Sequence, residues 1–352
     1  MKKIIILLCI LAASSAFTQT RYIGKDHYRV PLEKFFNPGV RNEKGFLDLA
    51  KWLVTRDQTL WPNWVKNTEK PNLPASLESN QMGITFINHS TFLIQIDGLT
   101  ILTDPVFSER VSPVSWAGPK RVRDPGMFIH ELPKIDVIVI SHNHYDHLDI
   151  ESLKKISKKF SPKIYMPMRA GKELREEGIK NIIELDWWAS DYFGETIKIT
   201  LAPAQHFSGR GLFDRNKSLW GSFVIRVNGY KIYFAGDTGY SNHFKEINER
   251  FGNMDFSLLP IGAYEPRWFM KQMHMNPSEA VRAHQDLMSR KSIGMHFGTF
   301  QLTDEGIYKP VEDLQRAKLK NKIAPNDFTV MSVGQTIIHN FGMSNIENFN
   351  KQ

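Results

Sequence analysis

Residues 141–149 read Ser141-His142-Asn143-His144-Tyr145-Asp146-His147-Leu148-Asp149 and directly follow the largely apolar run 135–140. This loop holds three histidines and one aspartate within positions 142–147. Imidazole nitrogens and carboxylate oxygens both suit zinc and similar divalent ions, and an ordinary zinc site uses four ligands. These four side chains are more than one such site takes from a single loop. The spacing therefore predicts two metal ions that share the loop.

Three further candidate ligands stand where predicted strands meet loops: His206, Asp237 and His296. Layered α/β folds often place binding and catalytic residues at such junctions. A carboxylate between two cations neutralises both and holds them about 3.5 to 4 Å apart. We therefore assign one zinc ion to His142, His144 and His206, a second to Asp146, His147 and His296, and the bridge between the two to Asp237.

A purely structural explanation fits this set of residues poorly. A lone histidine at a strand end is usually a packing or surface residue, and that would be the default for His206 or His296 taken singly. Loop ligands combined with spaced ones are much harder to explain in this way. Structural zinc sites also commonly use cysteine, and the chain has a single cysteine, Cys9, near its N-terminus.

The segment 81–345 predicts one catalytic domain of the α/β class, in which strands and helices alternate. We expect strands over 84–87, 91–96, 100–103, 136–140, 163–168, 182–185, 195–207, 220–227, 231–237, 256–261, 293–297 and 329–338. We expect helices over 150–159, 169–177, 242–251 and from Asn276, which is a typical N-cap because Pro277 and Glu279 follow it. Asp97-Gly98 and Asn228-Gly229 are typical of two-residue hairpin turns.

Residues 1–16 match a secretory signal peptide, because two lysines precede an apolar run over 4–13 and small residues up to Ala16. The run is too short to cross a bilayer. We expect cleavage near Ala16 and export, so that the protein is periplasmic or membrane-associated. Cys9 leaves with this segment, and the mature chain then has no thiol.

Residues 17–80 predict an N-terminal arm that is rich in aromatic residues and proline, with one helix over 45–55. The arm tryptophans Trp52, Trp61 and Trp64 either pack on the main domain or face a membrane, and packing is the default expectation. Residues 346–352 are expected to form a short C-terminal tail.

The net charge of the chain limits which kinds of partner we expect. The formal net charge is +8 at pH 7 for 352 residues, and removal of Lys2 and Lys3 with the signal peptide leaves +6 (8 minus 2). Basic proteins are attracted to nucleic acid, to anionic membrane surfaces and to phosphorylated substrates. Export makes nucleic acid the weakest of these, so we expect no nucleic-acid partner. A basic surface without any specific partner stays open.

The order of the motifs resembles the metallo-β-lactamase superfamily: an HxHxDH loop after a buried strand, a later histidine, a Gly-Asp-Thr turn at 236–238 and a final histidine. Within that superfamily, five stretches are similar to the N-acyl-phosphatidylethanolamine-hydrolysing phospholipase D enzymes. They are NHST at 88–91, LTDP at 102–105, SHNHYDH at 141–147, FAGDT at 234–238 and GAYEPRWFM at 262–270. The likeness extends from Phe36-Asn37-Pro38 in the arm to His296.

The resemblance implies a four-layer αββα sandwich with an N-terminal arm. It also implies hydrolysis, since the redox branch of the superfamily has an acid where His144 stands. The expected enzyme is a dinuclear-zinc phosphodiesterase of phospholipase D type. Its substrate would be a phospholipid at an anionic membrane surface, cleaved to an N-acylethanolamine and phosphatidic acid. Water between two zinc ions has a pKa lowered to about 7, so a hydroxide would attack phosphorus near neutral pH.

Two residues are expected to act in catalysis. Asp146 would orient the attacking hydroxide, and by the resemblance His274 contacts the phosphate or protonates the leaving oxygen. Asp104 is a candidate partner for a ligand histidine, and His89 a candidate for ordering a loop by hydrogen bonding. The remaining histidines, His27, His130, His243, His284 and His339, are expected to be surface or packing residues.

Two other functions stay open on the sequence. One is a lactonase or another metal-dependent hydrolase of a soluble metabolite, and the other is a non-catalytic lipid- or metal-binding protein. Two mixed aromatic and basic segments bear on this question: Trp116, Lys120, Arg121, Arg123, Met127 and Phe128, then Trp268, Phe269, Met270, Lys271 and Met273. Such mixtures suit a membrane interface, and equally a core with a solvated rim. A homo-oligomer also stays open.

Overall fold

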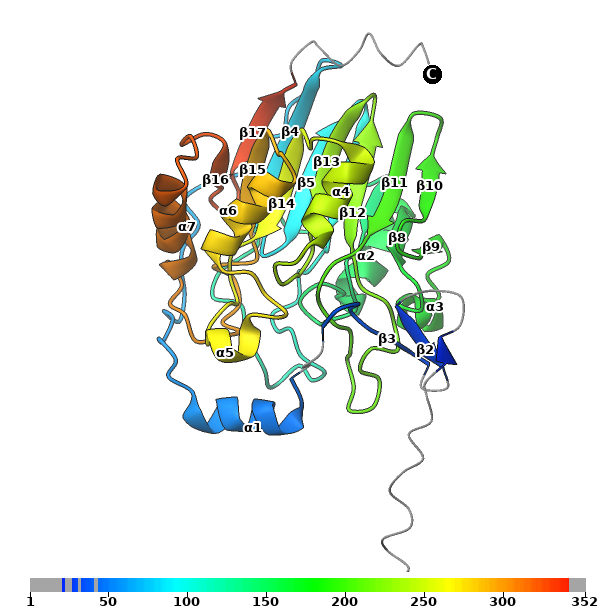
Figure 1. The fold of residues 1–352 in the computed structure, drawn as a ribbon. Helices are drawn as coiled ribbons and strands as arrows, with labels where there is room; N and C mark the ends of the chain where they lie inside the picture. The colour runs from blue at the N-terminus through cyan, green and yellow to red at the C-terminus, as the bar shows by residue number, and fades with distance from the viewer. Residues whose placement is uncertain (1–20, 23–26, 31–32, 41–43, 342–352) are drawn as a thin grey trace, which may run out of the picture.

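The computed structural model describes residues 21–22, 27–30, 33–40 and 44–341. The expected signal peptide (1–16) and the expected tail (346–352) lie outside the described residues. The boundaries of the arm and of the main domain stay predictions. Within the described part, two seven-stranded sheets face one another, and helices cover their outer faces (Figure 1).

The first sheet has the strand order β17-β4-β5-β6-β7-β8-β9. Its strands are β4 (Gln81–Asn88), β5 (Thr91–Ile96), β6 (Leu99–Thr103), β7 (Val137–Val139), β8 (Lys163–Pro167), β9 (Ile182–Leu185) and β17 (Thr336–Asn340). Strands β17, β4, β5 and β6 pair antiparallel, and β6 to β9 pair parallel. The sheet is thus a meander followed by parallel strands.

The second sheet repeats this plan with the order β10-β11-β12-β13-β14-β15-β16. Its strands are β10 (Ser190–Phe193), β11 (Ile197–Ala202), β12 (Ser222–Val227), β13 (Tyr230–Phe234), β14 (Phe256–Pro260), β15 (Lys291–Met295) and β16 (Phe328–Val330). Strands β10 to β13 pair antiparallel, and β13 to β16 pair parallel. Each sheet therefore changes from antiparallel to parallel pairing near its middle.

Hairpin chemistry and strand alternation explain the meanders. Asp97 and Gly98 have φ values of 51° and 75°, and Asn228 and Gly229 have 47° and 86°, as type I′ turns require. In β5 the side chains of Phe92 and Ile94 belong to the core between the sheets, whereas Leu93 belongs to the core under the helices of the first sheet. Both faces of each sheet are thus buried.

Helices form the two outer layers. α2 (Ile150–Phe160) and α3 (Lys172–Glu176) pack on the first sheet through Leu153, Ile156 and Leu174. α4 (His243–Phe251), α6 (Pro277–Asp286) and α7 (Lys309–Lys320) pack on the second sheet. The predicted four-layer αββα sandwich is confirmed.

The arm contributes the small sheet β1 (Arg21–Tyr22), β2 (Tyr28–Val30) and β3 (Lys34–Phe35), and the helix α1 (Phe46–Thr55). Trp52 of α1 is buried and stacks on Phe269 of the short helix α5 (Arg267–Met270), with ring centroids 5.1 Å apart. Its Nε1–H donates to Asp304 Oδ2 at 2.8 Å. The arm therefore packs on the main domain at Trp52, while Trp64 is half exposed.

One expected element is wrong. The predicted closing strand over 329–338 is two strands, since β16 joins the second sheet beside β15 and β17 crosses to the first sheet beside β4. The chain changes sheets at Gly334, whose φ is +91° and whose N–H donates to Phe86 O at 2.8 Å. A Cβ at this glycine would lie 2.5 Å from Glu69 O, so only glycine fits. Strand β10 and helices α5 and α7 were not expected.

The N-terminus of α6 gives the first testable prediction. The Asn276 side chain accepts from Glu279 N–H at 2.9 Å, and Glu279 Oε2 accepts from Asn276 N–H at 3.1 Å, which is the predicted capping box. Asn276→Ala should lower the free energy of unfolding by about 1 kcal/mol. Asn242→Ala is the matched control, because Asn242 starts α4 without a side-chain cap. Urea denaturation measures both, and equal losses would contradict the capping account.

Candidate metal centre

The seven predicted ligands converge on one edge of the two sheets because each follows a strand. The loop 141–149 follows β7, His206 follows β11, Asp237 follows β13 and His296 follows β15. His142, His147, His206, Asp237 and His296 are buried, and Asp146 has only 14% of its side chain exposed. The structure therefore brings together all the predicted ligands, whose role as ligands stays a prediction.

The first cluster holds three imidazoles. His142 Nε2 lies 2.8 Å from His144 Nδ1, and His206 Nε2 lies 3.3 Å from the same Nδ1. The ring of His144 is nearly perpendicular to those of His142 and His206. Three imidazole nitrogens that point at one place suit a cation with nitrogen ligands. This is the set predicted for the first zinc ion.

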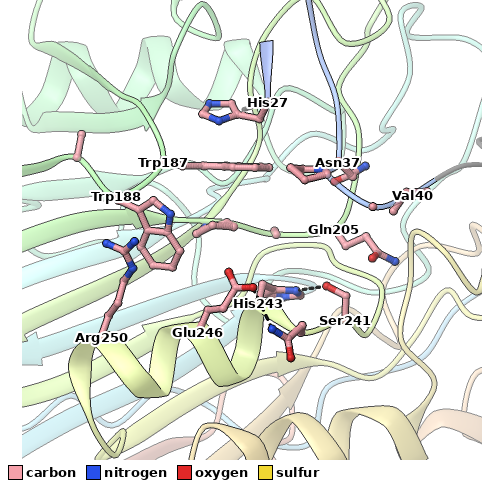
Figure 2. Close-up of a pocket in the computed structure, with 16 residues that line it drawn as sticks. His27, Asn37, Val40, Trp187, Trp188, Gln205, Ser241, His243, Glu246 and Arg250 are labelled. Carbon is pink, nitrogen blue, oxygen red and sulfur yellow. Dashed lines mark hydrogen bonds between the residues drawn. The ribbon is translucent and has the colours of Figure 1, made fainter. Parts of the chain in front are cut away.

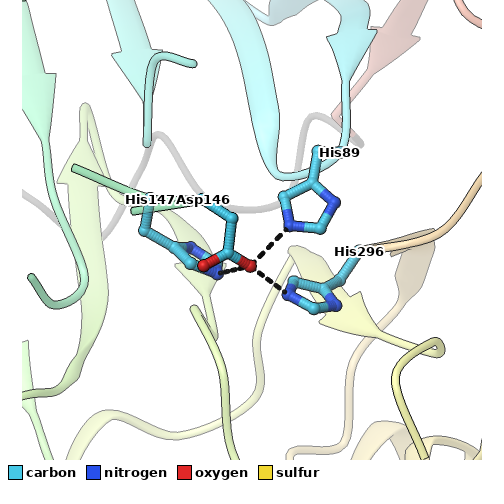
Figure 3. A group of neighbouring side chains, drawn as sticks. All are labelled: His89, Asp146, His147 and His296. Carbon is cyan, nitrogen blue, oxygen red and sulfur yellow. Dashed lines mark hydrogen bonds and ion pairs between the residues drawn. The ribbon is translucent and has the colours of Figure 1, made fainter. Parts of the chain in front are cut away.

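The second cluster is centred on one oxygen of Asp146 (Figure 3). Asp146 Oδ2 lies 3.1 Å from His89 Nε2, 3.3 Å from His296 Nε2 and 3.4 Å from His147 Nε2. Asp146, His147 and His296 are the set predicted for the second zinc ion. His89 was not predicted to join them.

Asp237 lies between the two clusters. Its Oδ2 is 3.1 Å from His296 Nε2, 3.2 Å from His147 Nε2 and 3.8 Å from His206 Nε2. Its Oδ1 is buried without a hydrogen-bond partner in the described part of the chain. A buried carboxylate oxygen without a partner is costly, and a cation on each side of Asp237 would satisfy both oxygens. This placement fits the predicted bridge.

The charges of the two clusters fit divalent cations. Burial acts to raise the pKa values of Asp146 and Asp237, but the neighbouring histidines, His147 foremost, hold both well below the usual range. Burial acts to lower the pKa of His296, yet Asp237 and Asp146 raise it to about 9. Burial lowers the pKa of His144 to about 4, so this ring is neutral as a ligand requires. Positive charge on His147 and His296 balances the two buried carboxylates, and bound divalent ions would take over that role when these imidazoles lose their protons.

In three of the predicted ligand histidines, the second ring nitrogen lies within hydrogen-bonding distance of a neighbouring oxygen. His147 Nδ1 lies 2.6 Å from Asp104 Oδ2, His206 Nδ1 lies 2.9 Å from Met273 O, and His142 Nδ1 lies 2.9 Å from Ser141 Oγ. Asp104 also accepts from Ser141 N–H and Oγ–H. Such contacts leave Nε2 free for a metal and fix the ring orientation. Asp104 therefore contacts His147, a predicted ligand, as the sequence led us to expect.

His274 lies beside both clusters. Its Nδ1 is 3.7 Å from Asp237 Oδ2, and its ring centroid is 5.1 Å from that of His206. This Nδ1 is buried and has no hydrogen-bond partner among the described residues. The position suits the predicted non-ligand role near the phosphate, and that role stays a prediction.

The remaining histidines lie outside the two clusters. His27 pairs with Asp186 at 2.7 Å, His284 contacts Ser292 at 2.8 Å, and His130 is exposed. His243 lines a cavity of about 850 Å³ between the arm and α4, together with Asn37, Trp188 and Arg250 (Figure 2). No predicted ligand lines this cavity, although Gln205 does so next to His206.

The contact between Asp104 and His147 gives the second prediction. Asp104→Asn keeps the shape of the side chain but removes its charge, so zinc should bind about 10- to 100-fold more weakly. Competition with a chromophoric chelator measures this affinity. Asp191→Asn is a matched control. Asp191 lies on β10, the edge strand of the second sheet, and it pairs with Lys163 of β8 instead of a predicted ligand. Unchanged zinc affinity in Asp104→Asn would show that the contact does not support the ligand.

Comparison with known proteins agrees with this geometry. Residues 100–297 match the family described as "Beta-lactamase superfamily domain". The chain is 39% identical over 264 residues to N-acyl-phosphatidylethanolamine-hydrolyzing phospholipase D 1 of Caenorhabditis elegans, covering 71% of this chain and 74% of that one. It is also 39% identical over 277 residues to an uncharacterized protein of Mycobacterium tuberculosis, covering 77% of this chain and 73% of the other.

The fold has a close match among solved structures. An isothiocyanate hydrolase from Delia radicum gut bacteria aligns with a TM-score of 0.60 at 19% identity, covering 74% of this chain and 100% of that one. Two mixed seven-stranded sheets, the clusters of histidines and aspartates, and the match over residues 100–297 all agree. The chain is a metal-dependent hydrolase that belongs to the metallo-β-lactamase superfamily.

Proposed function

We propose that this hydrolase is a dinuclear-zinc phosphodiesterase of phospholipase D type, which cleaves N-acyl-phosphatidylethanolamine to an N-acylethanolamine and phosphatidic acid. The observation that carries the proposal is the pair of buried ligand clusters joined by Asp237. Two metals about 3.5 to 4 Å apart suit in-line displacement at a phosphodiester. The similarity to the nematode phospholipase D supports the choice of lipid.

Two zinc ions bound at these clusters would stabilise charge on the phosphate oxygens and lower the pKa of a nucleophilic water. The chain itself orients the reactants. The neighbouring histidines hold the pKa of Asp146 well below its usual range, so this carboxylate is ionised and can orient the attacking water by accepting a hydrogen bond from it. Burial lowers the pKa of His274 to about 4, so its ring is neutral. Its unpartnered Nδ1 is then available to hold a phosphate oxygen or the leaving oxygen.

Apolar side chains lie between the first ligand cluster and helix α1. His144 contacts the ring of Phe207, with centroids 4.4 Å apart. Phe207 packs against a small cluster formed by Trp52 of α1 with Phe269, Met270 and Met273. Helix α1 therefore lies one layer of side chains away from the first ligand cluster. An acyl chain would meet apolar side chains near the proposed phosphate position.

Exposed apolar side chains of helix α1 and of the loop between β11 and β12 lie at this end of the molecule, and we call them the rim: Leu47, Leu53, Val54, Leu212 and Phe213. Val54 of α1 is 87% exposed, and Leu212 and Phe213 in the loop between β11 and β12 are 91% and 84% exposed. Helix α1 and this loop lie at the same end in Figure 1. Lys44 and Lys51 lie 5.5 and 4.9 Å from the Trp268 ring, beside the rim. Apolar side chains flanked by lysines suit an anionic lipid surface.

The two mixed aromatic and basic segments contain both buried and exposed residues. Arg121, Met127, Phe269, Met270 and Met273 are buried, so they do not face a membrane. Trp116, Phe128 and Trp268 are exposed. No helix in the described residues has both the length and the apolar character needed to span a bilayer. We therefore propose that the protein contacts a membrane surface peripherally, through the rim. Its export is a separate proposal, which is inferred from residues 1–16 alone.

The third prediction concerns the reaction. Purified zinc-loaded protein should release N-acylethanolamine from N-acyl-phosphatidylethanolamine in mixed micelles, measured by mass spectrometry. Asp237→Asn should abolish the release because it removes the charge between the clusters, whereas His284→Gln, a buried histidine outside the site, should keep it. Turnover of lactones without release from any phospholipid would overturn the proposed substrate. Near-normal rates in Asp237→Asn would rule out its bridging role.

The fourth prediction concerns the rim. Burying a Leu or Phe side chain contributes about 1.5 to 3 kcal/mol, so the double variant Leu212→Ser with Phe213→Ser should bind anionic vesicles at least about tenfold more weakly. Co-sedimentation with phosphatidylglycerol vesicles measures this binding. Leu319→Ser is the matched control, since Leu319 is 80% exposed but lies on α7. Equal vesicle binding in the two variants would contradict the rim.

A further inference from the structure

His89 occupies a hairpin that holds the segment carrying a predicted ligand. It lies between β4 and β5, next to a register shift at Phe86–Asn88, and has a φ of +46°. Its carbonyl accepts from the His296 N–H at 2.8 Å, and its own N–H donates to Thr299 Oγ1 at 3.1 Å. A bulge beside a functional site commonly re-aims a side chain. The backbone of His89 thus fixes both ends of the turn that starts at His296.

The His89 ring meets the second ligand cluster directly (Figure 3). Its Nε2 lies 3.1 Å from Asp146 Oδ2, and its centroid is 4.0 Å from that of His296. The ring of Phe300 closes the other side in an edge-on contact at 5.4 Å. Only 1% of the residue is exposed. Packing and the hairpin backbone therefore hold the ring in one orientation toward Asp146.

His89 is placed to hold a ligand, not to act as one. Asp146, His147, His296 and Asp237 already offer the second zinc ion as many protein ligands as a zinc site ordinarily uses, so no further protein ligand is needed. A ligating histidine usually donates its other ring N–H to a partner, as His147 does to Asp104. His89 Nδ1 is buried without a partner in the described residues. A proton there would be an unsatisfied donor at a cost of about 1 to 3 kcal/mol.

We propose that His89 is a positioning residue that donates its Nε2–H to Asp146 Oδ2 and thereby fixes how the Asp146 carboxylate faces the second zinc ion. A charge-assisted hydrogen bond of this kind is about twice as strong as a neutral one. Without it, the carboxylate would be free to turn about its terminal bond. The inference rests on the proposed two-zinc centre, and it extends that centre by one residue from a different part of the chain.

The test uses two variants of His89 and a zinc-binding readout. His89→Phe keeps a ring but removes the donor, whereas His89→Gln keeps a donor near the Nε2 position. His89→Phe should bind its second zinc ion about 10- to 100-fold more weakly in chelator competition. It should also lower kcat for the proposed lipid with little change in KM. His89→Gln should recover most of both. His284→Gln, a buried histidine outside the site, should match the wild type.

Three outcomes would overturn the proposal. If His89→Phe loses only thermal stability and binds two zinc ions with normal affinity, His89 is merely structural. If His89→Phe and His89→Gln both lose one zinc ion entirely, His89 is a ligand. If the wild-type protein binds a single zinc ion, no second ion exists for Asp146 to face. Failure of the lipid reaction alone would count against the proposed substrate, since zinc binding is measured without lipid.

Discussion

His147 lies between two buried aspartates, one from each sheet, and the metal centre depends on this arrangement. Asp104 follows β6, the last meander strand of the first sheet, and lies 2.6 Å from His147 Nδ1. Asp237 follows β13, the last meander strand of the second sheet, and lies 3.2 Å from His147 Nε2. Both carboxylates are almost inaccessible to solvent. The nearby carboxylates, Asp237 foremost, raise the pKa of His147 well above its usual value, so charge on this imidazole and on any bound cation stabilises the buried aspartates.

The fold explains why the two aspartates meet. Each sheet changes from antiparallel to parallel pairing after its meander, and both Asp104 and Asp237 stand at that change. The strand after β6 is β7, whose following loop carries His142, His144, Asp146 and His147. The strand after β13 is β14, which leads to α5 and His274. Because the sheets pack face to face, the two change points lie together. The ligands from distant parts of the sequence are then brought to one edge.

Much of this architecture could be predicted from the sequence because its signals are local. The loop 141–149, the hairpin turns at Asp97-Gly98 and Asn228-Gly229 and the capping box at Asn276 each depend on neighbouring residues. Contacts between distant parts of the chain have no such local signal. His89 lies 57 positions from Asp146, and their contact depends on how the β4–β5 hairpin, with its register shift, lies against the loop after β7 in the same sheet. At Gly334 the chain crosses from the second sheet to the first, and this crossing depends on contacts with the distant residues Phe86 and Glu69.

Composition alone also could not separate the core from the surface near the site. Phe269 and Met273 were as suitable for membrane contact as Trp268, yet they are buried because Trp52 of the arm covers them. Burying these side chains places α1 over the ligand-bearing loops and leaves its opposite face, with Leu47 and Val54, exposed. Helix α1 thus contributes Trp52 to the apolar cluster beside Phe207 and His144, and it also supplies part of the rim. If the rim contacts lipid as proposed, a phosphodiester in the headgroup layer would lie close to the ligand clusters without leaving the membrane.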